Sequence, residues 1–99
     1  VDIAEPRSRI KQRDSLMEWP EWWSWELELT PHLLKRMVDR QFNEVDLRLM
    51  FEGASGYREE NQEGRFLVET RHGGRAWAII VEPSIEDRVL IIITSYAVE

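Results

Sequence analysis

The chain lacks cysteine and has only two histidines among its 99 residues. Without cysteine it can form neither a disulfide framework nor a thiolate metal site. The histidines, His32 and His72, belong to no metal-binding motif such as HExxH, and no glycine-rich phosphate loop is present. The sequence therefore predicts no metal site and no cofactor.

Long apolar segments are also missing. Unbroken apolar runs such as Val89 to Ile93 are only as long as a strand, whereas a membrane-spanning helix needs about 20 apolar residues. The opening residues, VDIAEPRSRIKQRD, lack the apolar stretch of a secretory signal. These absences predict a cytoplasmic protein that does not contact the membrane.

Lysine is scarce, and acidic residues outnumber basic ones. Only Lys11 and Lys35 are lysine among 13 basic residues, and 19 acidic residues give a net charge of −6. Nucleic-acid-binding proteins usually carry a basic surface, so this balance argues against strong non-specific binding of a polyanion. The preference for arginine is typical of sites that bind phosphate or carboxylate through paired hydrogen bonds.

The length of the chain fits one small domain with a single core. Residues 1–22 are predicted to form a polar, partly flexible N-terminal arm, which includes the basic cluster RSRIKQR. Residues 23–99 are predicted to form the domain. The basic cluster is interpreted as a solvated tail, with contact to RNA as the alternative.

Four tryptophans lie within the segment EWPEWWSWELELTPH. Trp23 and Trp25 alternate with polar residues, which predicts the inward face of a first strand. Trp19 and Trp22 precede that alternation. They are expected to fold over one end of the sheet, and an exposed platform for stacking bases is the alternative.

Two helices and a set of strands follow. Thr30 is the expected N-cap of the first helix, and Asn43 with Asp46 that of the second. The segments RFLVETR, RAWAIIVE and DRVLIIITSYAV read as strands, a shorter one runs through GYREEN, and HGG marks a turn. This order predicts an α+β fold: strand, helix, helix, then a three- or four-stranded antiparallel meander, with the helices packed on one face of the sheet.

The residues with chemical potential are histidine, arginine and tyrosine. The candidate catalytic residues are His32, Arg36, Arg65, Arg75 and Tyr96. Such a set suits metal-independent cleavage of RNA, in which arginines bind the phosphate, a histidine or tyrosine transfers protons, and the ribose 2′-hydroxyl attacks. Each residue also has an ordinary structural interpretation, in hydrogen bonds, ion pairs or the sheet. His72 is interpreted as an exposed turn residue.

The segment LTPHLLKRMVDRQFNEVDLRLMF resembles the opening of a bacterial domain of unknown function related to the RelE and BrnT toxins. His32, Arg36, Met37 and Arg40 match its H-x-x-x-R-M-x-x-R helix. Later elements also match in order: Gly64 and Arg65 at a strand start, Arg75 at the next, and Thr94 with Tyr96 near the end. The resemblance covers about residues 24 to 97.

This resemblance implies a RelE-like sheet with two helices, and a toxin-type endoribonuclease that cuts mRNA without a metal and is held by an antitoxin partner. The alternative hypothesis is a non-catalytic interaction module of the same fold. Its acidic surface, with Trp19 and Trp22, would then bind a protein partner or a second copy of the chain as a homodimer.

Overall fold

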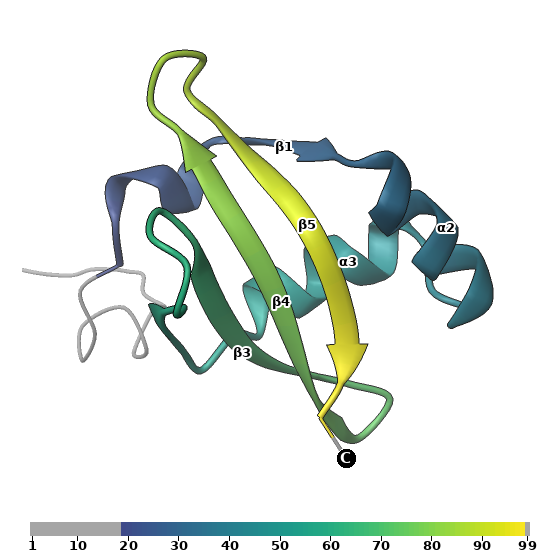
Figure 1. Cartoon of the computed structure of the whole chain (residues 1–99). Helices are drawn as coiled ribbons and strands as arrows, with labels where there is room; N and C mark the ends of the chain where they lie inside the picture. Colours follow the sequence, from purple (N-terminus) through teal and green to yellow (C-terminus); the bar gives the residue numbers. More distant parts are fainter. Residues whose placement is uncertain (1–18, 99) are drawn as a thin grey trace, which may run out of the picture.

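The computed structural model describes residues 19–98 and is an α+β domain built on one five-stranded mixed sheet (Figure 1). In chain order the elements are a 3₁₀ turn η1 (Glu21–Ser24), β1 (Glu26–Leu29), α2 (Pro31–Asp39), α3 (Glu44–Glu52), β2 (Gly56–Glu59), β3 (Phe66–His72), β4 (Arg75–Ser84) and β5 (Val89–Ala97). The α+β prediction is confirmed. The expected arm up to residue 18 lies outside the described residues.

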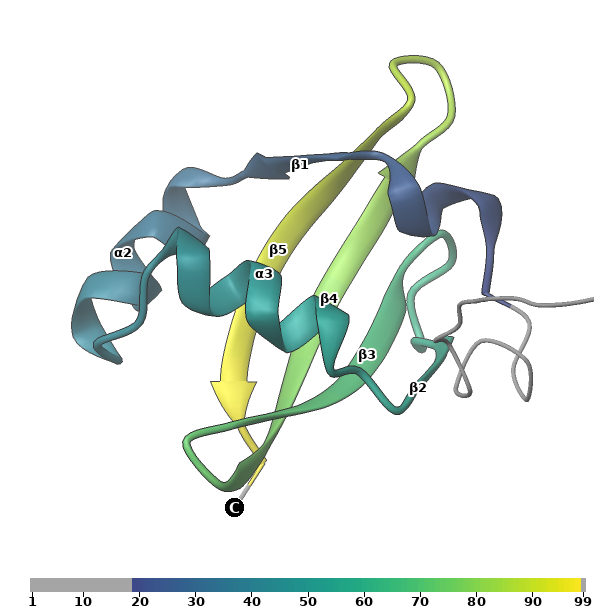
Figure 2. The same ribbon diagram turned by 180° about the vertical axis from the view of Figure 1, so that it is seen from behind.

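The strands are arranged in the order β1-β5-β4-β3-β2. Strands β2 to β5 form an antiparallel meander, and β1 pairs with β5 in parallel. Both helices lie on the same side of the sheet, with α3 crossing that face and α2 beside β5 (Figure 2). Leu33, Leu47 and Met50 from the helices are fully buried against this face. No helix among residues 19–98 is both long and apolar enough to cross a membrane.

The tryptophan segment packs over one end of the sheet. Trp22 is 8% exposed, and the ring centroid of Trp19 lies 4.3 Å from that of Trp23. Because Trp22 is buried, the alternative of an exposed platform is wrong for this residue. The first strand begins only at Glu26, so Trp23 belongs to η1 and Trp25 precedes the strand. Both still pack against the core, as their alternation predicted.

The two helix starts are fixed as the sequence predicted. The Thr30 hydroxyl accepts a hydrogen bond from the Leu33 amide at 3.1 Å and donates to the Ile92 carbonyl at 2.9 Å. Thr30 therefore both caps α2 and attaches it to β5. Asn43 and Asp46 form a reciprocal capping box at the start of α3.

The face of the sheet turned away from the helices carries a smaller apolar cluster. Leu67, Ala78 and Ile80 are its buried members, and Ile93 and Tyr96 pack against them. Antiparallel strands β3 and β4 are joined by Gly73 and Gly74, both at positive φ, as the HGG turn signal predicted. This uncovered surface is called the open face below.

Candidate functional site

A hollow of about 560 Å³ lies on the open face of the sheet. Glu69, Ala78 and Tyr96 are cross-strand neighbours in one row over β3, β4 and β5. The methyl side chain of Ala78 stands between two long side chains, because neighbouring strands are about 4.8 Å apart. Because its side chain is small, Ala78 forms part of the floor of the hollow, and the larger Tyr96 forms a wall. Arg58 and Arg71 also line the hollow.

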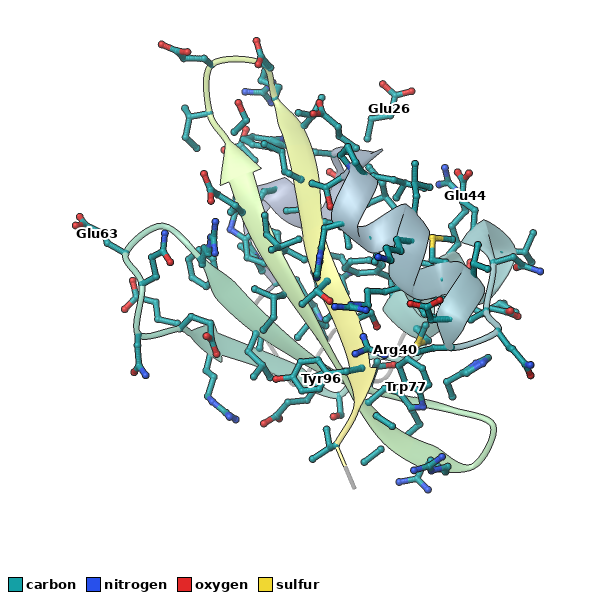
Figure 3. The ribbon with its side chains drawn as sticks, turned by 45° about the vertical axis from the view of Figure 1, so that its right-hand side comes forward. Glu26, Arg40, Glu44, Glu63, Trp77 and Tyr96 are labelled. Atoms are coloured by element: carbon teal, nitrogen blue, oxygen red, sulfur yellow. The ribbon has the colours of Figure 1, made fainter. Side chains whose placement is uncertain are left out.

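A second hollow, of about 510 Å³, adjoins the first at Tyr96. Its lining consists of Arg40, Arg75, Trp77, Tyr96 and Ala97. Figure 3 shows Arg40, Trp77 and Tyr96 beside the last part of β5, well away from Glu26 and Glu63. Tyr96 is half-buried and is the one tyrosine that lines both hollows.

Two arginines near Tyr96 are held by backbone carbonyls. Arg40 donates to the Ser95 carbonyl at 2.7 Å, and Arg71 to the Gly74 carbonyl at 2.6 Å. A carbonyl positions a guanidinium but does not neutralise its charge. By contrast, within residues 19–98, carboxylates pair with Arg36 (Asp39), Arg48 (Glu44), Arg58 (Glu69), Arg65 (Glu82) and Arg88 (Glu21).

The charge is therefore polarised along β5. At its start lie Glu26 and Glu28 on the neighbouring strand and Glu86 and Asp87 in the β4–β5 turn. At its end lie Arg40 and Arg75, which line the second hollow. Nine residues of strand separate the two ends by about 26 Å. The position of Arg40 and Arg75 is called the basic end of β5 below.

Two of the five predicted site residues meet in the structure. Arg75 and Tyr96 line the same hollow, whereas His32, Arg36 and Arg65 line neither. Arg65 and Arg75 begin adjacent antiparallel strands, so they lie at opposite ends of the β3–β4 hairpin. Arg65 is bonded to Glu82 at 2.9 Å there.

The two remaining candidates lie on α2. His32 is exposed in the first turn of the helix, and Arg36 pairs with Asp39 at 3.3 Å. Arg40, the last residue of the same H-x-x-x-R-M-x-x-R motif and the C-cap of α2, lines the second hollow. The motif placed these residues on one helix but did not show which end of it would meet the sheet.

His72 supports the second hollow from behind. Its ring lies 5.3 Å from that of Trp77 at 89° and 6.5 Å from that of Phe42. The side chain is half-buried, so its interpretation as an exposed turn residue was wrong. Because His72 is the cross-strand partner of Arg75, it packs on the same face and holds Trp77 in place.

No group of three or more histidine, cysteine, aspartate or glutamate side chains that could hold a metal ion occurs within the part of the chain that the structure describes. Comparison with protein-family models, curated proteins and solved structures gave no match. The arrangement of these side chains is therefore the basis for any functional conclusion. It offers cationic groups, a phenol and two adjoining cavities.

Proposed function

We propose that the protein is a toxin-type, metal-independent endoribonuclease-like domain with a RelE-like fold, acting at the two hollows that share Tyr96. The observation that carries this proposal is that Tyr96 lines one hollow with Arg40 and Arg75 and the other hollow with Arg71. Guanidinium groups bind the phosphates of a single strand, and an aromatic ring stacks on its bases. The order of elements and the resemblance to RelE and BrnT toxins support the same interpretation.

The chemistry requires no nucleophile from the protein. The ribose 2′-hydroxyl attacks phosphorus, its proton passes to a general base, and the bond to the 5′-oxygen breaks as a general acid protonates that oxygen. The products are a 2′,3′-cyclic phosphate and a 5′-hydroxyl end. Arg40 and Arg75 stabilise the charge that develops on the phosphate oxygens. Tyr96 is the proton-transfer group at the hollow, whereas His32 lies in the first turn of α2 and lines neither hollow.

The test is incubation of the purified chain with an end-labelled single-stranded RNA in EDTA, followed by analysis of the product ends. We expect cleavage to cyclic phosphate ends, and a loss of about 100-fold or more in rate for Tyr96→Phe, because general acid–base catalysis contributes roughly 10²–10⁴-fold. Arg75→Ala should lose rate by a similar factor, because electrostatic stabilisation of a transition state contributes about 10²–10³-fold.

A matched control is Arg48→Ala, which removes an exposed arginine that is paired with Glu44 on α3 and lines neither hollow. It should cleave at the wild-type rate. Induced expression in bacteria should arrest growth for the wild type and for Arg48→Ala, and not for Tyr96→Phe. Absence of cleavage by the folded wild-type chain, or equal rates for all variants, would refute the proposal.

A second candidate function is a non-catalytic interaction module, and a separate surface favours it. Leu34 and Val38 on α2, and Val45 and Leu49 on α3, are 48–78% exposed. Each pair is spaced i, i+4 and therefore lies on one face of its own helix. Contiguous exposed apolar patches are typical of surfaces that contact another protein. Sedimentation velocity over a range of concentrations, with Val38→Glu as the comparison, tests self-association through this surface. Trp22 takes no part, because it is buried within the domain.

A further inference from the structure

The open-face hollow differs chemically from its neighbour. Its floor includes Leu67, Ala76 and Ala78, whereas Glu69 and Arg58 stand at its rim. A carboxylate is out of place in a site for phosphate alone, because it repels the ligand. An apolar floor with polar groups at one side is the arrangement that proteins use to bind a small planar molecule. The volume of about 560 Å³ is within the range of such pockets.

The positions of Glu69 and Tyr96 define how a planar ligand would lie. They flank Ala78 on either side, across two strand spacings or about 9.6 Å. A base stacked against the Tyr96 ring would therefore turn an edge toward Glu69. The Tyr96 side chain also borders the hollow that holds Arg40 and Arg75. The open-face hollow could therefore bind the base of a nucleotide while the adjoining hollow binds its phosphate.

We propose that the open-face hollow binds one base of single-stranded RNA and that Glu69 selects guanine. An ionised carboxylate only accepts hydrogen bonds. Guanine presents two adjacent donors, N1–H and N2–H, on its Watson–Crick edge, so both carboxylate oxygens are satisfied by one base. Adenine and cytosine present one amino group beside an acceptor nitrogen, and uracil one N–H between two carbonyls. Each of these places an acceptor against the carboxylate.

The ion pair between Arg58 and Glu69 prepares this contact. Arg58 Nη1 donates to Glu69 Oε2, which fixes the carboxylate at the rim. Each carboxylate oxygen has two lone pairs, so Oε2 can accept a second hydrogen bond while Oε1 accepts another from the same base. Their side chains are 62% and 50% exposed, so the pair contributes little to stability. Replacement of Glu69 therefore tests recognition with little effect on folding.

This inference rests on the proposed function for its ligand class, and nucleotide binding tests it separately from cleavage. The experiment is NMR titration of the full chain with the 3′-monophosphates of guanosine, adenosine, cytidine and uridine. We expect guanosine 3′-monophosphate to bind about tenfold or more tightly than the other three, since a good bidentate contact is worth roughly 1–3 kcal/mol of discrimination. Glu69→Gln should lose that preference.

The control is Glu63→Gln, which makes the same change at an exposed residue that lines neither hollow. It should keep the preference for guanine. Equal affinity for the four nucleotides, no binding of any of them, or a preference that survives in Glu69→Gln would overturn the inference. Cleavage of RNA without preference for guanine would overturn it and leave the proposed function standing. Guanine binding without cleavage of RNA would overturn the proposed function and leave this inference standing.

Discussion

Thr30 offers the clearest test of how the fold places its basic end. Its hydroxyl accepts from the Leu33 amide and donates to the Ile92 carbonyl, and it lies 3.2 Å from the Ile93 carbonyl. One oxygen atom therefore starts α2 and attaches it to β5. Arg40, the C-cap of the same helix, donates to the Ser95 carbonyl on β5 and lines the second hollow. Loss of the hydroxyl should loosen both ends of this attachment.

Thr30→Val keeps the shape of the side chain and removes the hydroxyl. Loss of an N-cap costs about 1 kcal/mol, and loss of one further internal hydrogen bond costs about 1 kcal/mol. We expect the free energy of unfolding to fall by about 2 kcal/mol, which corresponds to a fall in Tm of roughly 8–16 °C for a domain of this size. Urea unfolding followed by tryptophan fluorescence measures this change.

Thr30→Ser is the matched control, because serine caps helices as well as threonine does. Its unfolding free energy should stay within about 0.5 kcal/mol of the wild type, the usual range for a substitution that removes no specific interaction. The reasoning is refuted if Thr30→Val is as stable as the wild type. It is refuted equally if serine and valine destabilise to the same extent, since the effect would then come from the methyl group.

Three further substitutions test other parts of the structure, each by urea unfolding. Trp22→Ala should lose about 3–5 kcal/mol, since the ring is buried in the core; a loss below 1 kcal/mol would contradict its assignment to the core. Gly74→Ala should lower the free energy of unfolding by about 1–2 kcal/mol, because φ is +80° there; no neighbouring atom lies within 4 Å, so the cost is conformational and not steric. Gly53→Ala, at φ −93°, should not show this conformational cost. Arg88→Gly should be more stable than Arg88→Ala, because φ is +55° at this position; the opposite order would mean that the backbone there is not strained.

The local features of the fold could be predicted because each depends on a few neighbouring residues. Thr30 and Asn43 cap helices through atoms three residues away, and Gly73–Gly74 form a turn by their own backbone freedom. The parallel pairing of β1 with β5 joins residues over 60 positions apart and leaves no periodic signal. The start of β1 at Glu26 was missed for a related reason. Trp23 lies in a 3₁₀ turn that directs its side chain against the core. The alternation of polar and apolar residues does not distinguish such a turn from a strand.

The candidate site was predicted only in part because its residues come from distant elements. Arg75 and Tyr96 meet because β4 starts where β5 ends. The same antiparallel rule removes Arg65 from them, since neighbouring strands of a hairpin start at opposite ends. The sequence does not distinguish Glu69 from the many other scattered carboxylates. It stands out only once its row with Ala78 and Tyr96 is known, and that row depends on the register of two strand pairs.

The net charge of −6 has less bearing on RNA binding than composition alone implies. The acidic start of β5 and the basic end are separated by about 26 Å of strand, and at physiological ionic strength charges are screened over about 8 Å. A phosphate at Arg40 and Arg75 therefore interacts mainly with the basic end. The acidic residues elsewhere limit non-specific attachment of a polyanion along the rest of the surface. A cluster of arginines at one end of an otherwise acidic chain would favour binding of a short single-stranded segment at one place, as the proposed RNA site requires.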